Sequence, residues 1–176
     1  DCEFDDACIC IPDPAGEICD DGIDNDCDDL VDCDDPDCDL DDACIVPPAP
    51  ENDLCEDAIL IECGETISGT TNDATFDDVG LCGTSNTAPG VWYKTAAAGK
   101  LTASTCNQAD FDTKLSVFEG ECGDLGCIGG NDDTAGCGGF TTELTWVSDG
   151  AENLVLVHGF GGATGNFDLT LTCEEL

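Results

Sequence analysis

From residue 51 onward, apolar and polar residues alternate over short runs that are separated by Gly, Asn and Asp. The run 166–172 is the clearest, with Phe167, Leu169 and Leu171 on one face and polar side chains on the other. A period of two is typical of a β-strand with one buried face. No segment carries a sustained apolar period of 3.6 residues, so we expect strands and turns.

The runs are short and regularly spaced, and the stretch Leu154-Val155-Leu156-Val157 is continuously apolar, as in a central strand covered on both faces. Strands at this spacing favour an all-β domain, a jelly-roll-like β-sandwich. The predicted strands are Ala58–Glu62, Glu65–Thr70, Val91–Ala96, Lys100–Thr105, Lys114–Phe118, Thr142–Val147, Asn153–His158 and Asn166–Thr172.

The composition changes at Pro47-Pro48-Ala49-Pro50, a run that favours extended polyproline geometry and acts as a semi-rigid spacer. We therefore predict a Cys/Asp-rich metal-binding segment over residues 1–46, a linker over 47–50 and the β-sandwich over 51–176. The first segment also contains a repeat, because residues 2–9 (CEFDDACI) and 38–45 (CDLDDACI) nearly match. Such a repeat is typical of units that stack on neighbours, or it is an old duplication without a present role.

Cysteine makes up 16 of the 176 residues, a density typical of a disulfide scaffold in an extracellular protein. Zinc or iron–sulfur ligation is disfavoured, because the chain has no C-x-x-C pair and a single histidine. The numbers before and after the linker are both even, so each part can close its own set, with the pairing left open. Our one local prediction joins Cys122 to Cys127 across a short turn. The positions are 2, 8, 10, 19, 27, 33, 38 and 44, then 55, 63, 82, 106, 122, 127, 137 and 173.

The formal net charge is −38, from 41 acidic residues against Lys94, Lys100 and Lys114. Nucleic acid and anionic membrane surfaces are excluded as partners, because both require clustered cations. Insertion into a membrane is not expected either, since no run approaches the roughly 20 apolar residues that span a bilayer. Almost half of the acids precede the linker, which favours a supply of metal ligands over a generally solvated acidic surface.

The chain lacks methionine and opens at Asp1, which we interpret as a processed, secreted product located outside the cell or on its surface. It has no Asn-x-Ser/Thr acceptor for N-glycosylation, while O-glycosylation of the threonines between Thr66 and Thr71 stays open.

The most specific stretch is residues 19–38, where aspartates alternate as calcium ligands do in an EF-hand loop. Two positions depart from that register: Asp29 stands where glycine usually makes the turn, and the last ligand is Asp in place of Glu. We expect a disulfide-framed loop without flanking helices and an affinity on the order of 10⁻⁴–10⁻³ M. The predicted Ca²⁺ ligands are Asp24, Asp26, Asp28, the carbonyl of Leu30, Asp32 and Asp35.

The string DGIDNDCDDLVDCDDPDC (residues 21–38) resembles the Asp/Cys-rich metal-binding repeats of large bacterial surface and secreted proteins. The resemblance implies an extracellular location and binding of a divalent metal. The repeat family includes a copper-associated surface protein, but hard carboxylates suit calcium better than copper.

The second part resembles the pre-peptidase C-terminal-like β-sandwiches of bacterial secreted proteins. The motifs that carry it are GVWYK (90–94), STCNQADFDTKLSVFEGEC (104–122), GGNDD (129–133) and LVHGFGGATGNFDLTLTC (156–173). The resemblance implies that the Phe-Asp-Thr and Asn-Asp-Asp turns approach each other, where their side chains either form a second calcium site or cap turns. These residues are Asp110, Asp112, Asn131, Asp132 and Asp133.

Catalysis is not expected. His158 lies at the end of an apolar strand, and the following glycines resemble an oxyanion loop without the G-x-S-x-G elbow that would accompany it. The aromatic residues Trp92, Tyr93 and Trp146 fit a core better than a sugar platform. The leading hypothesis is a non-enzymatic, calcium-stabilised structural subunit of a bacterial extracellular assembly. Its specific form is a filament in which the N-terminal segment docks head-to-tail on the next copy, a homopolymer. The alternative is a carbohydrate-binding or adhesive accessory module of a larger secreted enzyme, with glycans as partners.

Overall fold

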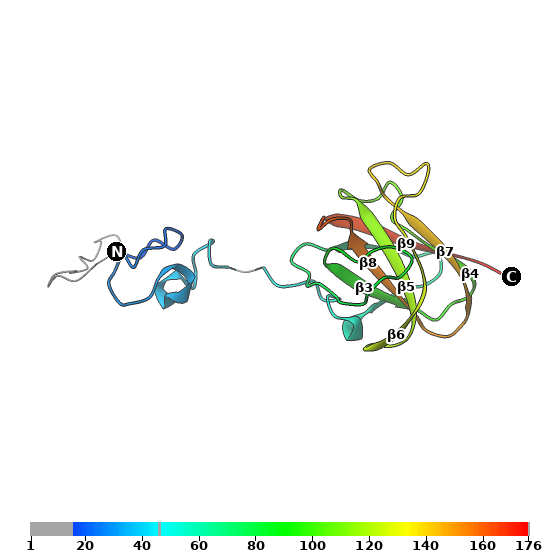
Figure 1. The fold of residues 1–176 in the computed structure, drawn as a ribbon, viewed down its shortest axis with the longest axis horizontal. Coiled ribbons are helices and arrows are strands. Elements are labelled where there is room, and N and C mark those ends of the chain that lie inside the picture. The colour runs from blue at the N-terminus through cyan, green and yellow to red at the C-terminus, as the bar shows by residue number, and fades with distance from the viewer. Residues whose placement is uncertain (1–15, 46, 176) are drawn as a thin grey trace. The chain divides into compact units, whose positions relative to one another are not determined.

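The structure is a computed structural model that describes residues 16–45 and 47–175. Clustering of the backbone contacts divides the chain into two compact units, Asp1–Pro47 and Pro48–Leu176 (Figure 1). The first copy of the internal repeat, residues 2–9, lies outside the described residues together with Cys10. No helix in the described part of the chain is long and apolar enough to cross a membrane.

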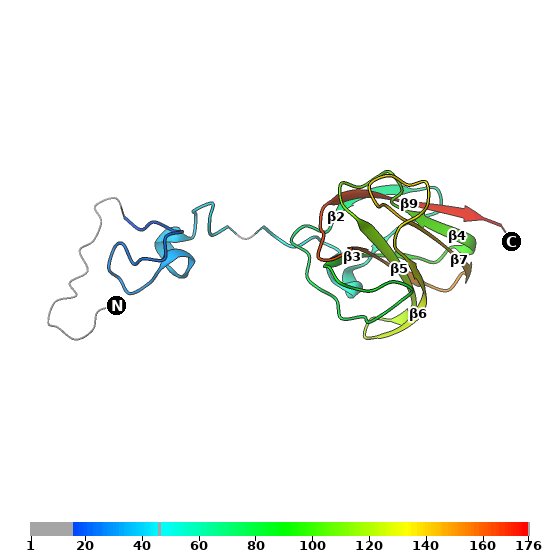
Figure 2. The same ribbon diagram turned by 45° about the horizontal axis from the view of Figure 1, so that its top comes forward.

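The second unit is an all-β sandwich of two sheets, which confirms the predicted fold class. The five-stranded sheet has the order β1-β3-β8-β5-β6 and the four-stranded sheet the order β2-β9-β4-β7. In Figure 2 the four-stranded sheet lies above β3, β5 and β6 of the other sheet. Neighbouring strands are antiparallel except β1 and β3, which are parallel. The strands are β1 (Ile59–Leu60), β2 (Thr66–Thr70), β3 (Gly90–Thr95), β4 (Ala98–Ser104), β5 (Thr113–Glu121), β6 (Asp124–Asn131), β7 (Glu143–Asp149), β8 (Asn153–Gly159) and β9 (Asn166–Glu174).

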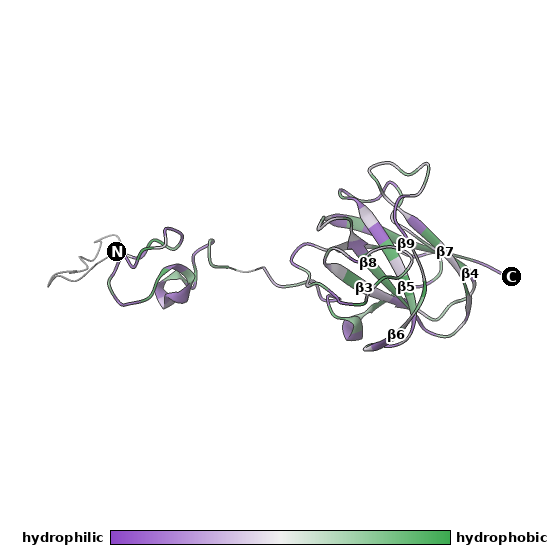
Figure 3. Ribbon diagram, in the orientation of Figure 1, coloured by the Kyte–Doolittle hydropathy of each residue, from purple (hydrophilic) through white to green (hydrophobic). Residues whose placement is uncertain are grey.

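Strand β8 is the middle strand of the five-stranded sheet, and all seven of its residues are buried. Its inward side chains, Val155 and Val157, belong to the core between the sheets, where they join Leu101, Leu169 and Leu171 of the opposite sheet. The continuous apolar run is therefore explained, because both faces of this strand are covered. Along β4 and β9 buried positions alternate with more exposed ones. Figure 3 shows the strands divided into short hydrophobic and hydrophilic segments.

A second apolar cluster lies on the outer face of the five-stranded sheet, where Trp92, Phe118 and Leu156 pack against Ala58 and Cys82. Two segments cover this face. Ala58 directly follows the short 3-10 helix η3 (Cys55–Asp57), and Cys82 belongs to the connection between β2 and β3. Two disulfides fasten the cover to β6 and to the turn before it. They are Cys55–Cys122 and Cys82–Cys127.

The predicted Cys122–Cys127 bridge is therefore wrong. Residues 120–127 form a hairpin that leaves both cysteines available to partners from the covering segments. Cys63–Cys173 and Cys106–Cys137 complete the set, so the second unit closes its own cysteines.

Strand β6 was not predicted, because its glycines and polar residues (DLGCIGGN) indicate a turn more than a strand. The structure shows one reason for a glycine: a side chain at Gly130 would collide with the carbonyl oxygen of Cys82. This close approach of two backbones is what brings Cys82 to Cys127. Tertiary packing thus overrides the weak strand propensity of the segment.

The described part of the first unit has two short 3-10 turns, η1 (Asp32–Asp34) and η2 (Pro36–Cys38), and no apolar core. The side chains that are buried there belong to Cys19, Asp35 and Cys38. Disulfides Cys19–Cys38 and Cys33–Cys44 close the unit, and Cys27 is also disulfide-bonded. The Ile and Leu side chains among its described residues are exposed, with Leu40 at 90%. Apolar burial therefore contributes little to the described part of this unit, where disulfides are the main stabilising links.

Candidate metal centres

The loop at residues 24–29 is organised by the side chain of Asp24. Its Oδ1 accepts hydrogen bonds from the backbone N–H groups of Cys27 and Asp28, at 2.6 and 3.1 Å, and its Oδ2 accepts one from Asp29 at 3.1 Å. These bonds wrap the chain around one carboxylate, a geometry that Asp favours because its short side chain reaches its own backbone. The position predicted as the first ligand is therefore the one that shapes the loop.

Asp29 takes the left-handed backbone conformation, with φ of 75°. A calcium-binding loop needs this conformation at its sixth position, where glycine usually supplies it. Asp tolerates the left-handed region better than most residues with a side chain. The departure from the glycine pattern at Asp29 is thus one of residue type and not of backbone geometry.

The predicted loop ligands separate into groups in the structure. One carboxylate oxygen from each of Asp24, Asp26 and Asp28 lies within 4.8 Å of the others, a spread that one metal ion can bridge. Asp32 is turned elsewhere, since its carboxylate accepts the N–H groups of Asp21 and Gly22 at 3.0–3.1 Å. Leu30 donates its N–H to Oδ1 of Asp28 at 2.9 Å.

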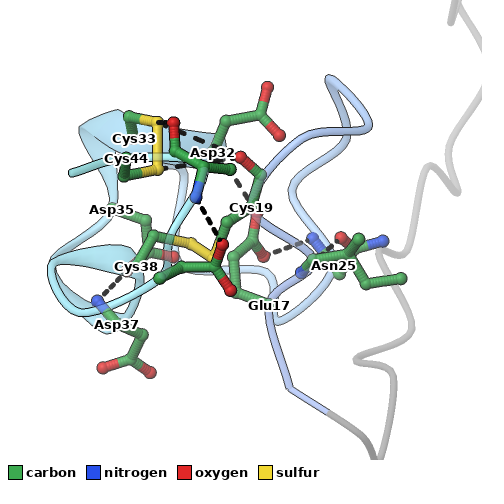
Figure 4. The surroundings of a disulfide bond; sticks show 12 residues. Glu17, Cys19, Asn25, Asp32, Cys33, Asp35, Asp37, Cys38 and Cys44 are labelled. Carbon is green, nitrogen blue, oxygen red and sulfur yellow. Dashed lines mark hydrogen bonds between the residues drawn. A yellow bond between two sulfur atoms is a disulfide. The ribbon is translucent and has the colours of Figure 1, made fainter. Parts of the chain in front are cut away.

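Asp35, the predicted last ligand, groups with Asp26 and with Glu17, a residue that the ligand register does not include. These three also lie within 4.8 Å of one another. Glu17 accepts N–H groups of Asn25, Asp26 and Asp32, at 2.8 to 3.3 Å, so it ties the start of the segment to the loop (Figure 4). The sequence gives no signal for this role, because Glu17 lies outside the alternating aspartates.

Charge crowding is strongest at Asp26, which is shared by both groups. Burial, followed by the neighbouring carboxylates of Asp28, Asp35 and Glu17, raises the pKa of Asp26 above its ordinary value. Oδ1 of Asp26 and Oδ2 of Asp35 are both buried, and neither has a hydrogen-bond donor among the described residues. Buried carboxylate oxygens normally have hydrogen-bond donors or cations as partners, so these two oxygens lack the partner that burial requires.

A third acidic group is located in the sandwich, where β5 begins and β6 ends. The carboxylates of Asp112, Asp132 and Asp133 lie within 4.8 Å of one another, as the resemblance of the two turns implies. The pairing of Leu115 with Asn131 in the β5–β6 ladder places them together. Burial, then the charges of Asp133 and Asp132, raise the pKa of Asp112, while Lys114 lowers it.

This group already has a cation beside it. The ammonium of Lys114 is fully buried and lies 3.2 Å from Oδ2 of Asp132, 2.9 Å from the hydroxyl of Ser85 and 4.7 Å from the centre of the Phe160 ring. Lys114 therefore neutralises part of the acidic charge. Oδ1 of Asp112 is buried and has no donor among the described residues.

The other two predicted residues of this region have structural roles. Asp110 accepts both the backbone N–H and the side-chain amide of Asn166, at 2.8 and 3.1 Å, away from the acidic group. Asn131 donates to Thr134, Thr142 and the carbonyl of Glu143, and so holds the following loop. Of the five predicted residues, Asp112, Asp132 and Asp133 are therefore grouped closely enough for one ion, whereas Asp110 and Asn131 bond to turns. A fourth group, Cys106, Cys137 and Glu143, is not a metal site because its cysteines form a disulfide.

The remaining candidate side chains lie in the interior. His158 is fully buried, and its Nε2 lies 3.1 Å from the hydroxyl of Ser116. Burial, together with the positive charge of Lys114, lowers its pKa to about 4. Trp92 and Trp146 are buried and donate their indole N–H to Asp77 and Asn153. Both tryptophans are core residues, so they do not form a surface sugar platform.

Comparisons with known proteins give no family assignment, since no family model matches and no curated protein matches. Among solved structures, the chain is similar to the pre-peptidase C-terminal domain of a collagenase from Bacillus anthracis. The identity is 12%, the match covers 73% of this chain and 100% of that one, and the TM-score is 0.43. It is also similar to PliG of Aeromonas hydrophila, a periplasmic inhibitor of g-type lysozyme, with 14% identity, coverage of 65% and 94%, and a TM-score of 0.39.

Proposed function

We propose that the protein is a non-enzymatic, calcium-stabilised structural subunit of an extracellular assembly, and that its N-terminal unit docks on the next copy to build a head-to-tail filament. The observation that carries the proposal is the composition of the first unit. Its described interior consists of disulfides and a buried aspartate in place of an apolar core. Binding of cations and of partner proteins would stabilise such a unit, because the apolar area buried among its described residues is small.

The placement of acidic groups supports calcium as the cation. The carboxylates of Asp24, Asp26 and Asp28 are close enough to bind one ion, and the Asp24 carboxylate accepts backbone N–H groups of the loop. Oxygen ligands alone are present in this group, and hard divalent cations prefer oxygen. With a net charge of −38 the chain also gains from any bound cation through reduced self-repulsion.

Two further features agree with a structural role. The described residues contain six complete disulfides, which suits a secreted protein that must persist outside the cell. Exposed apolar side chains of the first unit, among them Ile23, Leu40 and Ile45, offer contact area to a second copy. Heterologous contacts of this kind produce open filaments when the rotation between copies does not close a ring.

The test is the state of association of the full chain in millimolar calcium and in chelator, measured by sedimentation and by electron microscopy. We expect polymers in calcium and monomers in chelator. A chain that lacks residues 1–46 is the second sample, and it should stay monomeric in both buffers. A monomer in calcium, or polymers without residues 1–46, contradicts head-to-tail docking.

The accessory-module alternative predicts glycan binding by the isolated monomer. Since Trp92 and Trp146 are internal, such binding would use other side chains. The outer face of the four-stranded sheet offers hydroxyls for this, with pairs such as Thr66–Thr170 and Thr102–Thr145 bonded at 2.7–2.8 Å. A glycan array with the monomer separates the two functions, because reproducible hits without polymers favour the module.

A further inference from the structure

We propose that Glu17, Asp26 and Asp35 form a cation site for a calcium-sized divalent ion, distinct from the Asp24–Asp28 loop site and sharing with it one residue, Asp26. The site joins the start of the described N-terminal segment to the turn η2. It contains one residue, Glu17, that lies outside the loop's ligand register. This inference does not require that the chain form a filament.

The first argument is the burial of Asp35. Its side chain is 1% exposed, and its Oδ1 accepts the N–H of Asp37 at 2.7 Å, which caps η2 (Figure 4). Its Oδ2 is buried and has no donor in the described part of the chain. An ionised carboxylate is expelled from an interior unless a donor or a cation completes it. The protein keeps this one inside and beside two further carboxylates.

The second argument is that the neighbouring carboxylates have no hydrogen bond to Oδ2 of Asp35. Glu17 is held as an acceptor, since its two carboxylate oxygens take three backbone N–H bonds. Oδ1 of Asp26 is buried and also lacks a donor among the described residues. Two of the three neighbouring carboxylates therefore keep a buried oxygen without a donor among the described residues. A cation bound by the group would complete these two oxygens and would also neutralise charge at Glu17.

The third argument is size. The ligand oxygens lie within 4.8 Å of one another. Calcium binds oxygen at about 2.3–2.6 Å, so two ligands on opposite sides of the ion are separated by roughly 4.6–5.2 Å. Separations of at most 4.8 Å are therefore short enough for one calcium ion to bind all three carboxylates, with further ligands from water or backbone carbonyls.

The bound ion would link two parts of a segment whose described residues form no apolar core. Residue 17 precedes the first disulfide cysteine of the described segment, Cys19, and Asp35 lies next to η2, which contains its partner Cys38. A bound ion would add a second link beside this disulfide. Because Asp26 is common to both acidic groups, occupation of one site would also change the charge felt at the other.

The experiment is a calorimetric titration of the full-length protein with calcium, compared with three single variants. Asp35→Asn keeps the oxygen that caps η2 and removes the charge of the proposed site. Asp37→Asn is the matched control, because Asp37 is exposed, lies in the same turn and belongs to neither acidic group. Asp28→Asn tests the loop site. For Asp35→Asn we expect one ion fewer, or at least tenfold weaker binding of one ion, against less than a twofold change for Asp37→Asn.

Unchanged stoichiometry and affinity in Asp35→Asn overturns the proposal, and a simultaneous loss in Asp28→Asn then leaves the loop site standing. Loss in Asp35→Asn without loss in Asp28→Asn supports this site and counts against the loop site. A second measurement covers a misfolded variant: the backbone amide spectrum of the isotope-labelled wild-type protein during the titration. Saturable shifts at Glu17 and Asp35 support the site, and their absence while the Asp24–Asp28 amides shift overturns it.

Discussion

The substitution Lys114→Met tests whether the buried ammonium holds the acidic end of the β5–β6 hairpin. Methionine keeps most of the length of the side chain and removes its charge and its donors. The change breaks the 3.2 Å ion pair with Asp132, two hydrogen bonds to Ser85 and the contact with the Phe160 ring. It also leaves three grouped carboxylates without their neighbouring cation.

The expected loss follows from burial. Removing one partner of a buried ion pair costs about 3–5 kcal/mol, because the other charge stays behind uncompensated. The carboxylate of Asp132 is 37% exposed, so water screens part of that cost and the lower end, about 3 kcal/mol, applies. For a domain of this size such a loss lowers the melting temperature by roughly 10 °C.

Lys100→Met is the matched control. Lys100 forms an ion pair of 2.9 Å with Glu174, but the two side chains are 48% and 70% exposed. Exposed pairs contribute about 0–1 kcal/mol, so this variant should unfold almost as the wild type does. The two lysines thus have similar ion-pair distances, but Lys114 is buried and also bonds to Ser85, whereas Lys100 is exposed.

The assay is equilibrium unfolding in denaturant followed by tryptophan fluorescence, with chelator present and then in millimolar calcium. Calcium should recover part of the loss in Lys114→Met and none in Lys100→Met, because Asp112, Asp132 and Asp133 can then share a divalent ion. Equal destabilisation by the two substitutions, or a loss under 1 kcal/mol for Lys114→Met, would refute the reasoning from burial.

Three further predictions concern other parts of the chain. Burial raises the pKa of Asp77 from 3.8 to about 6, although the hydrogen bond from Trp92 lowers it. The folded state therefore favours the protonated carboxyl, and ionisation of Asp77 at high pH destabilises the fold. In urea titrations Asp77→Asn should be more stable than the wild type at pH 8, and the difference should be gone near pH 4. Replacing both Cys82 and Cys127 by Ala opens a loop of 45 residues and should lower the free energy of unfolding in denaturant by about 4 kcal/mol. An unchanged free energy of unfolding would contradict a stabilising role for this disulfide. Asp29→Gly relieves a φ of 75° and should strengthen calcium binding severalfold by calorimetry, whereas weaker binding would show that the Asp29 side chain is itself needed.

The sandwich was predictable because its strands obey simple patterns. The run Leu154–Val157 predicts a central strand, and β8 occupies that place with both faces covered. The alternation at Phe167, Leu169 and Leu171 predicts the buried face of β9. These patterns could be predicted because the spacing of apolar residues along a strand reflects which of its faces are buried.

The parts that were not predictable depend on contacts between distant residues. Pairing of Cys122 with Cys55 requires knowledge of which segment covers the sheet, and local spacing favours the wrong partner. Burial of Lys114 follows from the cover above β5, which no property of the strand itself indicates. Glu17 lies just before the loop that Cys19–Cys38 closes, and it groups with Asp26 and Asp35, which lie inside that loop. Its position relative to the aspartates is set by that closure and not by a ligand register.

The most direct test of the account is a high-resolution experimental structure of the protein in millimolar calcium. We predict a density peak between Glu17, Asp26 and Asp35, with carboxylate oxygens at about 2.3–2.6 Å from it, and a second peak at the Asp24–Asp28 loop. An interior in which Oδ2 of Asp35 accepts a protein or water donor, with no ion near either group, would contradict the claim that a divalent cation holds this unit together.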